Sequence, residues 1–170
     1  MNKTHEEHFK GWFVAVLENM KQDERAGFPI VMISFPLLER YLREKSGDHE
    51  NSLTSKSNEQ LRRIFPELAS PKQAEEFWNV WRNGTLHQAF PRIIGTSPND
   101  QCGGLCKSPD GRTAISIKAG NFWIHPHEFS DRIVNVIQSD FETFLGKGSP
   151  KHPVPVVISG RSGWSGTSAT

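Results

Sequence analysis

The sequence has few cysteines, no long apolar run and almost no net charge. Its 170 residues include 2 cysteines, which is too few for a disulfide-stapled scaffold. No apolar stretch approaches the roughly 20 residues of a membrane-spanning helix, and the first residues lack a signal-peptide pattern. With 20 Lys and Arg against 19 Asp and Glu, the net charge of +1 excludes a strongly basic arm for non-specific nucleic-acid binding but leaves room for a local basic cleft. We therefore expect a reduced, cytoplasmic protein that does not enter a membrane.

The overall composition is typical of one globular domain. Hydrophobic residues make up 35% of the chain and charged residues 23%, which is enough to form a buried core and argues against a disordered chain. We expect a single helical domain over residues 1–148 and a flexible tail, rich in Gly, Ser and Pro, over residues 149–170.

Helical periodicity is clearest in the first third of the chain. Between Phe9 and Met20 the apolar residues fall on one stripe, which predicts an amphipathic helix. A second apolar segment runs from Ile30 to Leu42 and contains Pro36, so its helix either starts near this proline or bends there. The polar run over residues 45–56 is predicted to be a loop.

Capping residues mark two further helix starts. Ser57 and Gln60 form a capping box for a short helix that must end around Pro66. Ser70, followed by Pro71 and by Gln73 three residues after the cap, is a stronger start. The buried stripe expected for this helix consists of Ala74, Phe77, Trp78 and Trp81.

The second half of the chain adds a predicted hairpin and a last helix. Residues 91–110 are predicted to be loop, whereas residues 113–118 and 121–125 are β-prone runs joined across Ala119-Gly120. The last amphipathic helix is expected to begin just after Pro126 and to close at Gly146 and Gly148. The predicted fold is therefore all-α: an up-and-down bundle of four to five helices with a small β-hairpin insert before the last helix.

The segment whose residues are best suited to catalysis follows the aromatic helix. Arg82 and Asn83 come directly after Trp81, and His87 is five residues beyond Arg82. Five residues correspond to about 140° around an ideal helix. Arg82 and His87 therefore converge only if the backbone departs from the helix or if a second copy of the chain supplies the partner.

This segment resembles the R-x(4-6)-H motif of the HEPN superfamily, the higher-eukaryote and prokaryote nucleotide-binding domains. The match is R-x4-H, with Asn83 as the polar residue directly after the arginine, and a looser resemblance covers residues 33–43 and 121–145. The resemblance implies a metal-independent endoribonuclease, often a toxin or anti-phage effector, whose composite active site forms between two protomers. It implies catalytic roles for Arg82, Asn83 and His87, RNA as substrate, a homodimer, and no cofactor.

These three side chains suit RNA cleavage on chemical grounds. Attack of a 2′-OH on the adjacent phosphate needs a base or acid near neutral pH, which His87 supplies. It also needs a cation that holds phosphate oxygens in a bidentate manner, which Arg82 supplies. Asn83 would orient the imidazole or a phosphate oxygen. The products would carry 2′,3′-cyclic phosphate ends.

Other interpretations of this segment stay open. Arg82 can instead neutralise carbonyls at the end of its helix, with His87 a satisfied polar group. The chain would then be a plain helical scaffold. A further interpretation is a non-catalytic HEPN-like nucleotide-binding or protein-interaction module, in which the same residues bind a phosphate or build the dimer. Arg43 and His49 also fit the motif spacing, but Glu44 follows that arginine. Ala89 stands where some HEPN toxins carry a tyrosine, so an antitoxin partner remains unknown.

A metal site is a weaker possibility. Cys102, Cys106, His125 and His127 are four potential zinc ligands, but the cysteines lie in a Gly-rich stretch. We expect no metal here, with free thiols and surface histidines. Trp123, which alternates with Phe122 in the predicted hairpin, is the aromatic side chain most expected to be exposed.

Overall fold

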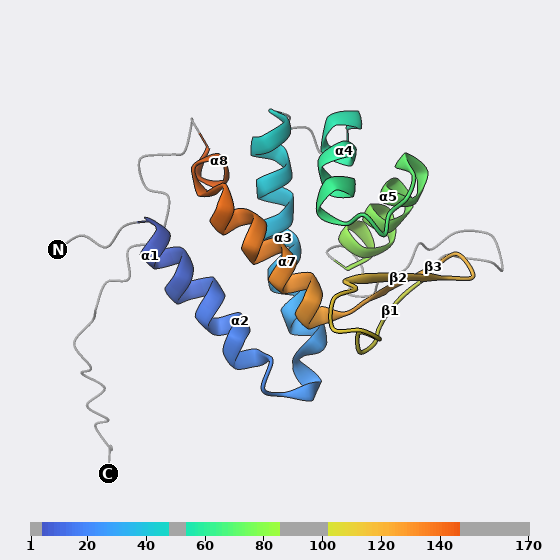
Figure 1. Ribbon diagram of the computed structural model, residues 1–170, viewed down its shortest axis with the longest axis horizontal. Coiled ribbons are helices and arrows are strands. Elements are labelled where there is room, and N and C mark those ends of the chain that lie inside the picture. Colours follow the sequence, from blue (N-terminus) through green and yellow to red (C-terminus); the bar gives the residue numbers. More distant parts are fainter. Residues whose placement is uncertain (1–4, 48–53, 86–101, 147–170) are drawn as a thin grey trace, which may run out of the picture.

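The computed structural model describes residues 5–47, 54–85 and 102–146. This part of the chain is mostly helical, with a small three-stranded mixed sheet before the last helices (Figure 1). The helical elements are α1 (His5–Phe9), η1 (Lys10–Val14), α2 (Ala15–Met20), η2 (Glu24–Ala26), α3 (Gly27–Ser46), α4 (Ser55–Ile64), α5 (Pro71–Trp78), η3 (Asn79–Asn83), α7 (Pro126–Ser139) and α8 (Phe141–Leu145). The strands are β1 (Gly103–Leu105), β2 (Ile115–Lys118) and β3 (Asn121–Ile124).

The predicted first helix is present, but its buried stripe is shifted by a π-helical turn. The turn, η1, lies between α1 and α2, and its i→i+5 hydrogen bonds place one extra residue in the helix. Phe9 and Leu17 are buried, whereas Val16 is 40% exposed. The extra residue therefore moves Leu17 onto the face where an uninterrupted α-helix would have placed Val16.

Helix α3 forms the centre of the molecule and packs against α7, α4 and α8. It continues through Pro36, so of the two predicted alternatives, a start near that proline or a bend there, the start is wrong. The reason is burial on both sides of the proline, because Val31, Phe35, Leu37 and Leu38 are all in the core. The Phe35 ring lies among those of Phe77, Trp81 and Phe129, at 5.2 to 6.4 Å between centroids.

The two predicted helix starts have different outcomes. Ser70 caps α5 as predicted, since its side chain accepts a hydrogen bond from the Gln73 amide at 3.2 Å, and Pro71 is the first helical residue. The prediction that a capping box at Ser57 begins the helix is wrong. Helix α4 begins at Ser55, and Thr54 is the N-cap, accepting from the Ser57 amide at 3.4 Å.

The small sheet contains the predicted hairpin and one strand that was not predicted. Strands β2 and β3 pair antiparallel, with Ser116 opposite Trp123. Strand β1 lies in the region predicted to be loop, and it pairs parallel with β3, with Gly104 opposite Trp123. Propensity in this Gly-rich stretch is low, so β1 depends on tertiary pairing with β3. The order β1-β3-β2 places the predicted hairpin strand β3 in the middle.

The predicted last helix is divided. It begins at Pro126 and breaks at Asp140, whose φ of −138° and ψ of 49° lie outside the helical region. The Asp140 carboxylate accepts hydrogen bonds from Tyr41, Lys45 and Thr143 at this break. The tail over 149–170 lies outside the described residues. No helix in the described ranges is both long and apolar enough to cross a membrane.

Candidate functional site

The candidate site is positioned by a π-helical turn that continues α5. Within this turn, η3, the Trp81 side chain is fully buried and its indole N–H donates to the carbonyl of Phe122 at 3.2 Å. Trp81 therefore anchors the turn against β3. The next residue, Arg82, extends toward α3.

Arg82 makes a two-point contact with Glu39 of α3. Its Nε donates to Glu39 Oε2 at 3.0 Å, and its Nη2 donates to Glu39 Oε1 at 2.8 Å. Both side chains are only 15% exposed. Bidentate charged hydrogen bonds of this kind fix the guanidinium plane as well as its position. The Arg82 side chain is thus held in one orientation by a carboxylate from another helix.

Two amides and a second arginine complete this group, which we call the Arg82 cluster: Glu39, Arg43, Asn79, Arg82 and Asn83. Asn83 Oδ1 accepts from Arg82 Nη1 at 3.0 Å, and Asn83 Nδ2 donates to Asn79 Oδ1 at 2.9 Å. Arg43 Nη2 donates to Glu39 Oε1 at 2.5 Å. The cluster contains two cations and one anion.

The charge state of Glu39 follows from these contacts. Burial raises the pKa of its carboxyl group, but the hydrogen bond and charge of Arg82, together with Arg43, outweigh burial. The pKa is therefore below its ordinary value, and Glu39 is ionised at neutral pH.

The structure brings together two of the three predicted catalytic residues. Arg82 and Asn83 are in direct contact, whereas His87 lies outside the described residues. The π-helical turn η3 departs from α-helical geometry but ends at Asn83, so only the start of the interval between Arg82 and His87 lies within it. The chain stays helical at Gly84, whose φ of −60° and ψ of −47° lie in the helical region. π-Helical turns are found mostly as single turns and frequently at functional sites.

Glu39 and Arg43 were not predicted as site residues. Their i,i+4 spacing on the second apolar helix is a visible sequence signal for a pair on one helix face. That signal does not reveal the third member, Arg82, because its contact with Glu39 depends on how α3 packs against η3.

The structure does not bring the four potential zinc ligands together at one point. Cys102 and Cys106 flank β1, and four residues of extended strand span about 13 Å. The Cys106 Sγ lies 3.4 Å from His125 Nδ1. Within the described ranges, no three His, Cys, Asp or Glu side chains come close enough together to hold a metal ion.

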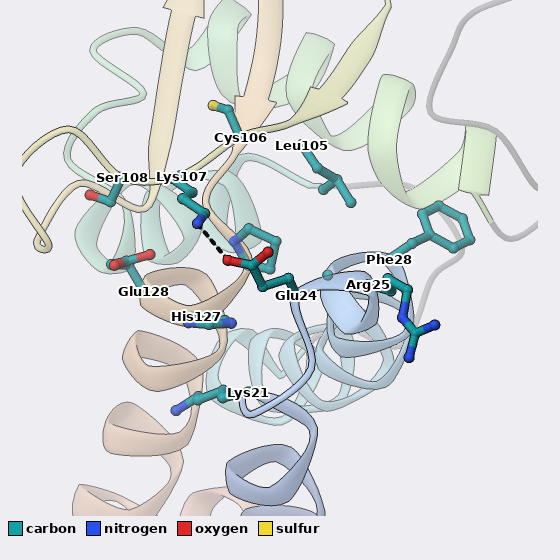
Figure 2. A pocket seen from close by; sticks show the side chains of 12 residues that line it. Lys21, Glu24, Arg25, Phe28, Leu105, Cys106, Lys107, Ser108, His127 and Glu128 are labelled. Atoms are coloured by element: carbon teal, nitrogen blue, oxygen red, sulfur yellow. Dashed lines mark hydrogen bonds and ion pairs between the residues drawn. The ribbon is translucent and has the colours of Figure 1, made fainter.

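A cavity of about 580 Å³ lies at the start of α3 (Figure 2). Leu105, Phe28 and Pro126 supply apolar walls, and an exposed ion pair between Lys107 and Glu24, at 2.8 Å, crosses it. Gly27 in its wall and Glu39 in the Arg82 cluster are twelve residues apart on α3, about 18 Å along the helix axis. The cavity and the cluster are therefore separate. Charges of both signs line the cavity, so its lining favours no single class of ligand.

Comparisons with known proteins give no further guide to function. A scan against protein-family models, a search of curated proteins and a search of solved structures each found no match.

Proposed function

We propose that this protein is a metal-independent endoribonuclease of HEPN type, with an up-and-down helical bundle and a composite active site between two copies of the chain. A role as a toxin or anti-phage effector would fit this activity. The observation that supports the proposal is the Arg82 cluster, in which the two described motif residues contact each other and Glu39 holds Arg82. The motif arginine is therefore positioned by the fold.

The proposed reaction divides the work between a cation and an imidazole. The 2′-oxygen attacks the neighbouring phosphorus, the bond from phosphorus to the 5′-oxygen breaks, and a 2′,3′-cyclic phosphate and a 5′-hydroxyl result. His87 takes the proton from the 2′-OH or gives one to the leaving oxygen. Arg82 stabilises the negative charge that grows on the phosphate oxygens.

Glu39 and Arg43 supply the setting for Arg82. The carboxylate fixes the guanidinium by two hydrogen bonds, so that little conformational entropy is lost when a phosphate arrives. Arg43 shares the same carboxylate, so two guanidinium groups lie side by side on Glu39. Guanidinium groups are well suited to bind the oxygens of a phosphate diester.

The proposed homodimer can be tested by its dependence on concentration. If two protomers form each active site, cleavage per chain should rise steeply with protein concentration until dimers predominate, and analytical ultracentrifugation should show the same midpoint. The substrate is a single-stranded RNA oligonucleotide, and the control is the same oligonucleotide with 2′-O-methyl groups, which lacks the nucleophile. Cleavage of the methylated strand would contradict the proposed chemistry.

A non-catalytic module is the second candidate, and one observation favours it. Arg82 already contacts Glu39 through two nitrogens and Asn83 through a third. A purely structural ion pair would have this geometry. The two candidates differ in one result: the module would bind RNA or a nucleotide, or join two protomers, without ever shortening the RNA.

A further inference from the structure

Three polar side chains from separate strands meet at one end of the small sheet. Cys106 follows β1, Ser116 lies in β2 and His125 follows β3. The main chain fixes two of these positions, since the Cys106 amide donates to the Ile124 carbonyl at 3.1 Å and the His125 amide donates to the Ala114 carbonyl at 3.0 Å. The pairing of the strands therefore brings these groups together.

Their contacts form a chain from thiol to imidazole to hydroxyl. Cys106 Sγ lies 3.4 Å from His125 Nδ1, and His125 Nε2 lies 2.8 Å from Ser116 Oγ. His125 is only 1% exposed, whereas Cys106 and Ser116 are partly exposed. An activated thiol typically has a base within hydrogen-bond reach and a third group that orients this base.

The tautomer of His125 decides which group it activates. When Nε2–H donates to Ser116, Nδ1 carries a lone pair and accepts from the thiol. The Cys106 carbonyl oxygen, 3.2 Å from Nδ1, favours the opposite tautomer, in which Nδ1–H donates to that carbonyl. A thiol is a far better nucleophile than a serine hydroxyl, and Cys106 is therefore the group that we expect to react.

The surroundings of Cys106 keep the resting thiol protonated. Burial raises the pKa of this thiol, and the charge of Lys118 offsets that rise only in part. Reaction at neutral pH therefore requires a base in direct contact with the sulfur, because the thiolate is the reactive form.

We propose that Cys106 is a modification site that exchanges with small disulfide molecules, with His125 as its base and Ser116 as the residue that positions His125. As the Cys106 sulfur bonds to one sulfur of the incoming disulfide, the thiol proton passes to His125 Nδ1. The disulfide bond breaks, and the departing thiolate receives that proton. The products are a mixed disulfide on Cys106 and one free small thiol, and the incoming disulfide is the oxidant.

The second cysteine provides a matched control within the same chain. Cys102 lies at the other end of β1, is exposed, and its Sγ is 3.3 Å from the side-chain oxygen of Asn121. Exposure alone would make Cys102 the faster thiol. Within the described part of the chain, the Cys102 sulfur contacts an amide and no imidazole.

The experiment measures reaction with 4,4′-dithiodipyridine in two single-cysteine proteins. Cys102→Ser leaves Cys106, and Cys106→Ser leaves Cys102. The rate for an unassisted thiol falls by about tenfold between pH 8 and pH 7, because it follows the thiolate fraction. We expect this fall for Cys102, and a fall of less than about threefold for Cys106, because His125 rather than hydroxide removes its proton.

Three further substitutions test the assigned roles in the Cys102→Ser protein. His125→Asn should restore the tenfold fall, and Ser116→Ala should restore most of it, whereas Ser116→Thr should keep the flat profile. Circular dichroism checks the fold of each variant, and the Ser116 pair decides the matter if His125→Asn does not fold. A tenfold fall for Cys106 in the parent protein, or a flat profile that persists in Ser116→Ala, would overturn the proposal.

Discussion

Arg82 and Glu39 join two helices that are far apart in the sequence. Nε and Nη2 of the arginine donate to the two oxygens of the carboxylate, and both side chains are 15% exposed. This contact holds η3 against α3, and it places the motif arginine beside a second cation, Arg43.

Removal of the Glu39 carboxylate should destabilise the fold. Glu39→Ala leaves Arg82 and Arg43 partly buried and without their shared anion, and charged hydrogen bonds of this kind contribute about 1.5–3 kcal/mol. We therefore expect a loss of about 2 kcal/mol in the free energy of unfolding, measured with urea. The control is Glu59→Ala, which breaks an exposed i,i+4 pair with Arg63 and should cost less than about 0.5 kcal/mol.

Because the Glu39 carboxylate takes part in this contact, we expect the free energy of unfolding to depend on pH. The pKa of Glu39 in the folded state lies below the ordinary glutamate value of 4.5, so its contribution to stability is present above pH 4.5 and is lost as the pH falls through the lowered pKa. The difference in unfolding free energy between wild type and Glu39→Gln should therefore shrink below about pH 4. A difference that stays constant from pH 7 to pH 3 would show that the ion pair does not contribute to stability.

The ionisation of Tyr41 can be followed without interference from other tyrosines, because the chain contains a single tyrosine. Burial, together with the hydrogen bond that its hydroxyl donates to Asp140 at 3.1 Å, raises its pKa to about 12. Its contribution to stability is present below pH 10 and is lost as the pH rises through the folded pKa. Tyrosinate absorbance should titrate near 12 in wild type and closer to 10 in Asp140→Asn. Equal midpoints in the two proteins would rule out the Asp140 contact.

Gly104 is predicted to be required for the unexpected strand β1. A Cβ at this position would overlap the six-membered ring of Trp123, which covers the glycine from β3. Gly104→Ala should therefore cost about 1–3 kcal/mol in the free energy of unfolding. Gly11→Ala is the matched control, since no atom lies within 4 Å of its added Cβ. That helical substitution should stabilise the protein by about 0.5–1 kcal/mol, and a similar effect at Gly104 would contradict the packing described.

Arg82→Lys tests the proposed bidentate role at constant charge. A lysine offers one ammonium group and cannot reproduce the planar fork that contacts Glu39 and would hold a phosphate. If RNA cleavage depends on that fork, its rate should fall by about tenfold to a hundredfold, as for a loss of about 1.5–3 kcal/mol. An unchanged rate in a folded Arg82→Lys protein would leave only the charge of Arg82 relevant to the reaction.

Local signals in the sequence predicted some elements correctly, although the capping box expected at Ser57 did not mark the start of α4. Ser70, Pro71 and Gln73 fixed the start of α5, and the glycine turn after Ala119 fixed the β2–β3 hairpin. Features that depend on distant partners escaped prediction. Strand β1 needs β3 beside it, and the break at Asp140 coincides with contacts from α3.

In the candidate site, too, neighbouring residues could be predicted and distant partners could not. Arg82 and Asn83 were visible as a pair because they are adjacent in the sequence, and the structure places them in contact. Glu39 was not visible, because it is 43 residues away from Arg82 and becomes its partner only when α3 packs against η3. The π-helical turn also escaped prediction, since an α-helical period fits the same apolar residues.

The most direct test of the central claim compares wild type with His87→Ala on total RNA in EDTA. The fold of each protein is checked by its thermal unfolding, and the fragments are examined for their 3′ ends. The proposed function predicts that wild type alone shortens the RNA and leaves 2′,3′-cyclic phosphate ends. No cleavage by either protein would favour the non-catalytic module, and equal cleavage by both would contradict the assignment of His87.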